Sequence, residues 1–354
     1  MTATMHTPET QDSNAVFPMT PRGPLSAELM TLLSSAPDGT ESSVGLAIAV
    51  ESALADAESI TRDEDVQLSL FILYGLHYGS LGGVSAEWEW QPSLVAARTA
   101  LERAFESELR ATIEVPGLPE PTRAAVAQAL TALTTAEGGP SLSRFVAKKA
   151  TREQLGEFLI QRSIYTLREA DPHSWAIPRL TGRPKAALVE IQTDEYGGGR
   201  VARIHSEIFA TTMREFGLDA AYGHYLEQAP AVTLASLNVM SMFGLNRRLR
   251  GAIVGHLAAF EMTSSIPNAM YANGFRRLGF GTGVTAYFDE HVAADAVHEQ
   301  IAAHDLAGAL AEDEPELLGD ILFGAAACLV VDGWAGAHML DYWTAGVSSL
   351  RDER

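Results

Sequence analysis

The chain has 354 residues and a formal net charge of −20, with 45 acidic against 25 basic side chains. It is long enough to bury one large core or two smaller ones. So acidic a chain argues against nucleic acid and anionic membranes as partners, because both attract basic patches. The single cysteine, Cys328, excludes an internal disulfide. No basic-then-apolar signal pattern opens the chain, and the longest apolar run, 321–331, is too short to span a bilayer, so we expect a soluble cytoplasmic protein.

Composition divides the chain into a tail and a helical part. Residues 1–42 are rich in Thr, Ser, Pro and Gly and poor in aromatic residues, which predicts a flexible N-terminal tail. From residue 43 to residue 354, nearly every segment has apolar residues at helical spacing. We expect a single helical domain there, in which residues 43–140 form accessory helices and residues 141–354 form the core.

Proline and glycine mark most of the expected helix ends. The predicted helices cover 65–81, 92–112, 122–136, 141–170, 185–195, 200–216, 229–244, 246–265, 285–310 and 315–346. Residues 176–184 are expected to form a loop, and no segment is a convincing strand. Because the connections are short, the pattern predicts an all-α bundle of mostly antiparallel helices.

The segment 288–299 carries the strongest chemical pattern. His291, Asp295 and His298 stand at i, i+4 and i+7, so on a helix they share one narrow face. Two imidazoles and a carboxylate on one face can bind a metal ion, and Asp295-x-x-His298 is the kind of pair that inward-facing bundle helices use for iron or manganese. The alternative is a solvated charged face, because three further acidic residues lie in the same segment.

Three ionisable residues in the middle of the chain are candidate partners for this segment. Glu169 lies near the C-terminal end of a predicted helix, where the helix dipole disfavours a carboxylate. Glu195 and His205 flank the triple glycine 197–199, which lets the backbone bend. Ordinary alternatives exist for two of them: Glu169 as an acid beside a helix terminus, and His205 as a satisfied core histidine.

Glu261 is a further candidate, because it directly follows the apolar run 252–260. A carboxylate there is costly to bury unless it is paired or bound to metal. A plain salt bridge with Arg250 is the alternative. His256 lies off the stripe of Glu261, and we interpret it as a core histidine or as a neighbour of the metal ligands.

Together the candidates supply four carboxylates and three imidazoles, which suits two divalent ions. The seven residues are Glu169, Glu195, His205, Glu261, His291, Asp295 and His298. Oxygen and imidazole donors without thiolate favour iron or manganese over structural zinc. The chain has one carboxylate-x-x-His pair, whereas a ferritin-like dimetal protein has two, so the sequence points to another helical scaffold.

Four stretches of the sequence carry a family resemblance: 169–173 (Glu-Ala-Asp-Pro-His), 190–196 (Glu-Ile-Gln-Thr-Asp-Glu-Tyr), 255–261 (Gly-His-Leu-Ala-Ala-Phe-Glu) and 289–291 (Asp-Glu-His). In these stretches, and in the order and spacing of the seven candidates, the chain resembles the haem-oxygenase-like diiron oxidases and oxygenases, in their bacterial iron-containing redox enzyme branch. The resemblance runs from about residue 68 to residue 351. It is specific for the scaffold and the metal centre and weak for the substrate.

The resemblance implies a haem-oxygenase-like seven-helix bundle, here with extra N-terminal helices. It also implies that the seven candidates bind two Fe(II) ions, with O2 as co-substrate. A third histidine, His291 or His205 depending on the member compared, places the chain nearer the N-oxygenase type of ligand set. An external electron donor and a homodimer are plausible from the resemblance alone.

The function implied by the resemblance is that of an O2-dependent non-haem diiron oxidase or oxygenase in natural-product biosynthesis. Its substrate would be an amino acid or an amino-acid-derived small molecule. The reaction would be N-oxygenation, or C–H desaturation, hydroxylation or C–C cleavage. Two other hypotheses are a non-catalytic protein of the same fold that binds metal or a small ligand, and a purely structural bundle without metal.

Tyr165 and Arg162 are the candidate catalytic residues. Tyr165 lies one helical turn before Glu169, and Arg162 is one of four basic residues that can bind a substrate carboxylate. The other three are Arg179, Lys185 and Arg200. The alternatives are simple packing for the tyrosine and surface placement for the basic residues.

Overall fold

The computed structural model describes residues 19–37, 42–135 and 141–352, without the side chains of residues 42–43 and 293–297. Every regular element in these ranges is helical, so the all-α prediction is confirmed. The helices are α1 (Pro24–Leu33), α2 (Ser42–Asp56), α3 (Glu64–Tyr78), α4 (Pro92–Thr112), α5 (Arg123–Thr134), α6 (Leu142–Lys148), α7 (Arg152–Thr166), α8 (Asp171–Ser174), α9 (Gly182–Glu195), α10 (His205–Phe216), α11 (Ala231–Leu245), α12 (Arg250–Arg277), α13 (Thr282–Gln300), the π-helix η8 (Ile301–Gly308), α14 (Ala309–Asp313) and α15 (Leu318–Thr344).

Local sequence sets many of the helix ends. Pro92 occupies the first turn of α4, where its missing N–H removes no helical hydrogen bond, and the predicted range 92–112 agrees with this helix. Asp63 caps α3 by accepting a hydrogen bond from the backbone N–H of Val66 at 2.8 Å. Gly79 ends the same helix in the left-handed conformation, with φ of 62°.

The helix predicted over 141–170 is two helices in the structure. Thr151 and Gln154 form a capping box, which starts α7 anew after a break at the end of α6. Helix α7 ends at Thr166, so Glu169 lies in the turn beyond it rather than on the helix. The prediction missed this break because a capping box inside an apolar pattern does not interrupt the periodicity.

The helix predicted to end at residue 265 continues as α12 through Pro267 to Arg277. A proline inside a helix removes one backbone hydrogen bond and costs about 3 kcal/mol. Packing of the residues beyond the proline offsets this free energy, because Ala272 and Phe275 are fully buried in an apolar cluster with α7, α10 and α13. Tertiary packing here overrides a local signal for a helix end.

The prediction of a flexible tail through residue 42 is wrong for Pro24–Leu33, which form helix α1. Leu25, Leu29 and Leu33 are buried, and the Asp65 carboxylate accepts hydrogen bonds from the backbone N–H groups of Leu25 and Ser26. Three leucines at helical spacing are the signal that composition alone hid. Residues 1–18 and 38–41 lie outside the described ranges.

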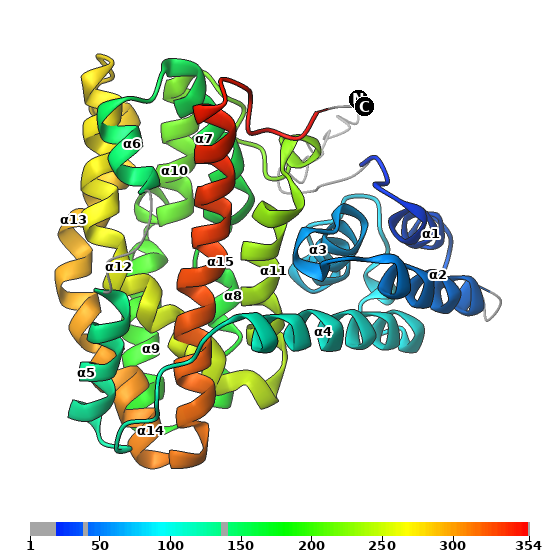
Figure 1. The fold of residues 1–354 in the computed structure, drawn as a ribbon, viewed down its shortest axis with the longest axis horizontal. Coiled ribbons are helices and arrows are strands. Elements are labelled where there is room, and N and C mark those ends of the chain that lie inside the picture. Colours follow the sequence, from blue (N-terminus) through cyan, green and yellow to red (C-terminus); the bar gives the residue numbers. More distant parts are fainter. Residues whose placement is uncertain (1–18, 38–41, 136–140, 353–354) are drawn as a thin grey trace, which may run out of the picture.

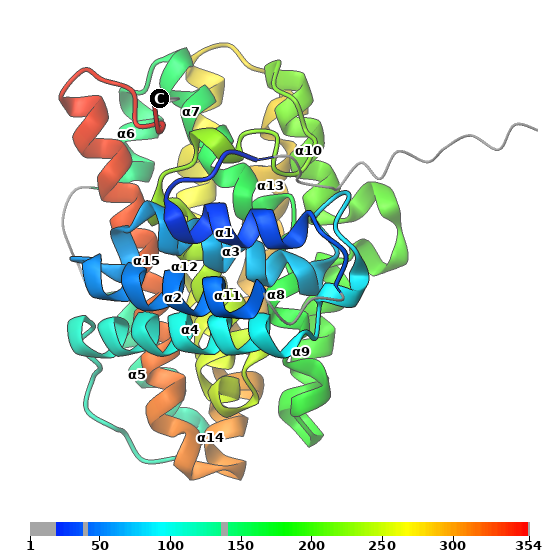
Figure 2. The same ribbon diagram turned by 90° about the vertical axis from the view of Figure 1, so that its right-hand side faces the viewer.

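Helices α1 to α4 form a layer on one side of the bundle, where α3 packs on α11 (Figures 1 and 2). Helix α5 lies apart from this layer and packs against η8 and α12. The larger bundle contains α6 to α15, with α12 in contact with both α13 and α15. The division of the chain into accessory helices and core at residue 140 stays a prediction.

Helices α12 and α15 cross with their backbones in direct contact. A Cβ on Gly255 would collide with the backbone of Ile321, and a Cβ on Gly324 would collide with the backbone of Ala252. Glycine at both positions is therefore required for this close approach. The stretch Pro315–Thr344 is apolar and long enough to cross a membrane, yet 61% of its most apolar window is buried inside the described structure, where it forms part of the bundle core.

Candidate metal centre

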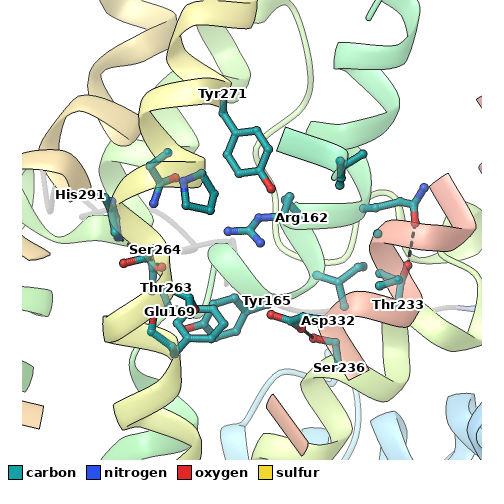
Figure 3. Close-up of a pocket in the computed structure, with 18 of the residues that line it drawn as sticks. Arg162, Tyr165, Glu169, Thr233, Ser236, Thr263, Ser264, Tyr271, His291 and Asp332 are labelled. Atoms are coloured by element: carbon teal, nitrogen blue, oxygen red, sulfur yellow. Dashed lines mark hydrogen bonds and ion pairs between the residues drawn. The ribbon is translucent and has the colours of Figure 1, made fainter. Parts of the chain in front are cut away.

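A cavity of about 310 Å³ lies inside the bundle, between α7, α9, α11, α12, α13 and α15. Four of the predicted metal ligands line it, together with both predicted catalytic residues, Arg162 and Tyr165. Figure 3 shows Glu169 and His291 toward one side of this space, Asp332 toward the other, and the Arg162 guanidinium between them. The cavity therefore has two chemically different sides.

Glu169, Glu195, His205 and His291 form the first ligand group. Their side chains are buried, and one donor atom from each lies within 4.8 Å of the others. Ala170, next to Glu169, has φ of 74°, the only positive φ outside glycine among the described residues. An alanine held there is strained, and this strain belongs to the turn that carries Glu169 from the end of α7 into the cavity.

The triple glycine brings Glu195 and His205 together. Glu195 is the last residue of α9 and His205 is the first of α10. The three glycines between them have φ of 66°, 59° and 76°, a region that glycine occupies without strain. A Cβ on Gly197 would collide with the backbone of Arg203 and Ile204. The chain folds back over these glycines and places His205 Nδ1 2.9 Å from Glu195 Oε2.

His291 is oriented by its own helix. Its Nδ1 lies 2.9 Å from the carbonyl oxygen of Tyr287, one turn earlier in α13. Because a carbonyl only accepts hydrogen bonds, Nδ1 carries the proton in the neutral ring and Nε2 keeps its lone pair. That Nε2 lies 3.5 Å from Glu169 Oε1, and the Tyr287 hydroxyl donates to the same oxygen at 2.6 Å. The arrangement presents Nε2 of His291 and a fixed Glu169 carboxylate to one point.

Glu195, Glu261 and His298 form the second ligand group, again with donor atoms within 4.8 Å of one another. His298 Nδ1 lies 3.3 Å from Glu261 Oε2, while its Nε2 lies 3.0 Å from Asp194 Oδ2. A hydrogen bond donated to Asp194 holds a proton on Nε2, so that Nδ1 is left as the ligand atom. Glu195 belongs to both groups, which places the two groups side by side.

Four candidate metal-ligand atoms in these groups have no hydrogen-bond partner among the described residues. They are Glu169 Oε2, Glu195 Oε2, His205 Nδ1 and His298 Nδ1. The 2.9 Å contact between His205 and Glu195 is thus short without being a well-directed hydrogen bond. Buried polar atoms without partners are costly and rare. Carboxylate oxygens and imidazole nitrogens that converge in this way fit iron or manganese.

In the metal-free protein, the histidines supply the positive charge that the carboxylates require. Burial alone would lower the pKa of His291, but the adjacent Glu169 carboxylate raises it to about 10. Burial likewise opposes protonation of His298, and the adjacent Glu261 carboxylate, 3.3 Å from Nδ1, raises its pKa to about 9. Burial would raise the pKa of Glu169, yet His291 holds it below its usual value. Protons thus occupy the place that a metal cation would take.

The structure brings together six of the seven predicted ligands in these two groups. The seventh, Asp295, belongs to α13 between His291 and His298, and its side chain lies outside the described residues. Its role as a ligand stays a prediction.

Of the four basic residues proposed to bind a carboxylate, Arg162 lines the cavity and the other three do not. Arg179 donates hydrogen bonds to the backbone carbonyls of Gly244 and Leu245, which is a structural role. Tyr165 lines the cavity and packs its ring edge-on against Phe260, with centroids 5.4 Å apart.

Sequence reasoning missed three residues at this site: Tyr287, Asp194 and Asp332. Tyr287 stands four residues before His291, so helical spacing alone places it on the same face. Asp194 is one of several acids near Glu195, with Glu190 and Glu207, and spacing alone does not choose among them. Asp332 is an acid inside an apolar helix, the same signal that singled out Glu261.

The histidine predicted as a core residue, His256, is buried and pairs with another buried histidine. Its Nδ1 lies 3.2 Å from Nε2 of His173, and burial lowers the pKa of His173 to about 4. The pKa of His256 is also lowered, chiefly by burial. His173 lines the cavity, so this neutral pair adjoins the ligand groups.

Comparison with known proteins agrees with this geometry. A family described as "Iron-containing redox enzyme" matches residues 156–333, a range that contains both catalytic candidates and all seven predicted ligands. The chain is also 28% identical over 219 residues to a nitrosourea synthase from Streptomyces achromogenes subsp. streptozoticus. This match covers 61% of the chain and 46% of that relative, so the chain spans about half the relative's length. The chain belongs to the family of iron-containing redox enzymes, and its helical bundle is of the haem-oxygenase-like kind.

Proposed function

We propose that the chain is an O2-dependent non-haem diiron oxygenase that acts on an amino acid or an amino-acid-derived molecule in natural-product biosynthesis. The observation that carries this proposal is the position of Glu195, which belongs to both ligand groups. A carboxylate has two oxygens and can bridge two ions, as in other two-metal sites. The similarity to a nitrosourea synthase favours oxidation of nitrogen over the C–H and C–C alternatives.

In this proposal, Glu169, His205 and His291 would hold one ion, Glu261 and His298 would hold the other, and Glu195 could supply an oxygen to each. Asp295 stays a predicted ligand without an assigned ion. Bound iron supplies the redox chemistry that activates O2. The chain contributes the fixed positions of the donors. Tyr287 holds one oxygen of Glu169 in place by its hydrogen bond, and Asp194 fixes the ring orientation of His298.

Apolar and aromatic side chains complete the setting for this chemistry. Phe158, Leu257 and Phe260 line the cavity beside the ligand groups and displace water from it. Burial raises the pKa of Tyr165 well above its ordinary value, with a further contribution from Glu169, so its hydroxyl keeps its proton and can donate a hydrogen bond.

The proposal is tested by loading the full chain with Fe(II) under anaerobic conditions and measuring bound metal, followed by O2 uptake with and without candidate substrates. We expect two iron ions per chain and an O2 uptake that a substrate accelerates. Iron binding without any substrate-dependent O2 uptake would favour the non-catalytic binding protein. A chain that retains no metal would instead support the purely structural bundle.

A further inference from the structure

The cavity also carries two opposite charges that do not belong to the ligand groups. Arg162 comes from α7 and Asp332 from α15, and both line the same space as Glu169 and His291. Figure 3 shows the Arg162 guanidinium in the middle of this space, with the Asp332 carboxylate below it. The metal ligands do not account for either residue.

Among the described side chains, Arg162 has no ion-pair partner. Its Nε atom is buried without a hydrogen-bond acceptor, and the closest recorded contact of its Cζ with an aromatic ring is at 5.9 Å, to the centroid of Phe158. A guanidinium stays charged at any pH that a protein tolerates. An enclosed cation without a paired anion is costly, and its N–H groups can donate two parallel hydrogen bonds to a carboxylate.

Asp332 has one hydrogen-bond donor within the described ranges, the hydroxyl of Ser236, which donates to Oδ1 at 2.6 Å. Burial raises the pKa of Asp332, and both this hydrogen bond and the charge of Arg162 act in the opposite direction. Arg162 and Asp332 thus influence each other electrostatically, yet they form no direct ion pair. The gap between them can take a group that satisfies both.

The helix around Asp332 leaves room for such a group. Gly333, Ala335 and Gly336 line the cavity without long side chains. A Cβ on Gly333 would meet nothing within 4 Å, and a Cβ on Gly336 would touch only the side chain of Leu142. The volume of about 310 Å³ is at the lower end of ligand sites, which suits a molecule of amino-acid size.

We propose that Arg162 and Asp332 bind the head group of an α-amino acid, with the carboxylate on Arg162, the ammonium on Asp332, and the side chain directed toward the ligand groups. A zwitterion adds no net charge to the cavity and satisfies both residues. A plain carboxylic acid leaves Asp332 uncompensated, and a plain amine leaves Arg162 uncompensated. This assignment rests on the proposed function only for the fate of the side chain, since binding of the head group needs no turnover.

The first experiment measures binding by calorimetry, using the full chain loaded with Fe(II) without O2. The common amino acids are compared first, and the tightest binder is then compared with its decarboxylated amine and its deaminated acid. For leucine these are isoamylamine and isocaproic acid. We expect the amino acid to bind roughly 10–100-fold more tightly than either analogue, because each analogue loses one charged hydrogen-bonding partner. Equal binding of the amino acid and one analogue, or no binding of any amino acid, overturns the proposal.

The second experiment assigns each charge to its residue. Asp332→Asn should weaken the amino acid roughly 10–100-fold and leave the deaminated acid unchanged or tighter. Arg162→Met should weaken the amino acid by a similar factor and leave the amine unchanged, and Arg162→Lys should restore part of the loss. Asp341→Asn is the matched control, because it removes the same charge from an exposed position on the same helix. Uniform weakening of all three ligands in Asp332→Asn would mean that the pair only balances charge, and it would overturn the assignment.

The two proposals fail in different ways. If an amino acid binds with this charge dependence but the protein never consumes O2, the oxygenase proposal is refuted and the head-group site is supported. The opposite outcome is a protein that binds two iron ions and consumes O2 with a substrate that lacks an amino-acid head group. That outcome would support the oxygenase proposal and refute the head-group site. Calorimetry and O2 uptake report on these outcomes separately.

Discussion

The first and second ligand groups, which are the two halves of the candidate metal centre, are held in place by different parts of the protein. His291 and Glu169 are fixed from within, by a backbone carbonyl and by the buried hydroxyl of Tyr287. His298 is fixed by Asp194, whose side chain is 63% exposed. A ligand oriented by the core keeps its geometry as long as the bundle is folded. A ligand oriented by a surface carboxylate depends on one exposed hydrogen bond, so we expect the second half to be the weaker metal site.

The largest expected effect comes from removing the residue that both halves share. Glu195→Ala should reduce bound iron from two ions to fewer than one per chain, because it deletes a donor from each group. Metal analysis after anaerobic loading measures this. Glu190→Gln is the control, since it neutralises an exposed acid on the same helix. Retention of one tightly bound ion in Glu195→Ala would show that the halves are independent and that Glu195 does not bridge them.

The second prediction is that metal affinity rises with pH. The rise should continue to a higher pH for the group that contains His291 than for the group that contains His298. The pKa values of His291 and His298 in the metal-free fold, about 10 and about 9, lie above the ordinary value of 6.5. Protons on these rings therefore stabilise the metal-free fold at neutral pH, and this stabilisation is lost as pH rises through 9 and then 10. A metal needs the unprotonated ring, so affinity should rise by up to about tenfold per pH unit for each proton displaced.

Calorimetric titration in buffers of different ionisation enthalpy counts the protons that iron displaces. We expect release of protons at neutral pH and a smaller release above pH 9, where His298 has already lost its proton. Binding that is independent of pH across this range would contradict the coupling between these histidines and their carboxylates.

The third prediction concerns Asp194 alone. Asp194→Asn removes the charge that orients His298 and should weaken one of the two iron ions by roughly 10–100-fold, while the other stays bound. Stepwise titration with Fe(II) separates the two affinities. Glu190→Gln again serves as the control. An equal loss at both ions would show that the halves respond as one unit.

The smallest expected effect is a change in hydrogen-exchange protection within α13. Removal of iron leaves the carboxylates of the two groups close together with only protons to offset them, so the segment from His291 to His298 should be less protected without metal. Hydrogen exchange of the full chain with and without Fe(II) should differ on the order of tenfold in this segment and little in α7. Equal protection of this segment in both states would refute the coupling of metal binding to local order.

The sequence indicated helices and ligands well where one signal was sufficient. Helix α4 follows from apolar periodicity, the candidate ligand Glu261 from an acid after an apolar run, and the candidates His291 and His298 from their spacing on one helical face. Spacing could not show that α7 stops before Glu169, because that turn depends on the strained backbone at Ala170.

Features that arise only from packing were also beyond the sequence. The passage of α12 through Pro267 depends on side chains buried two turns later. The partnership of His298 with Asp194, rather than with another nearby acid, depends on how α9 meets α13. Contacts between residues more than a hundred positions apart leave no trace in local composition, so these ligand partners required the fold.

The crossing of α12 and α15 at Gly255 and Gly324 has a consequence for what the protein can recognise. Two backbones pressed together at two glycines cannot slide along each other without a collision, so the axial offset between the helices is fixed. Glu261 lies six residues beyond one glycine and Asp332 eight beyond the other. In the proposed function, the crossing would therefore set the distance between the oxidised atom of a substrate and its charged end, and it would select substrates by length.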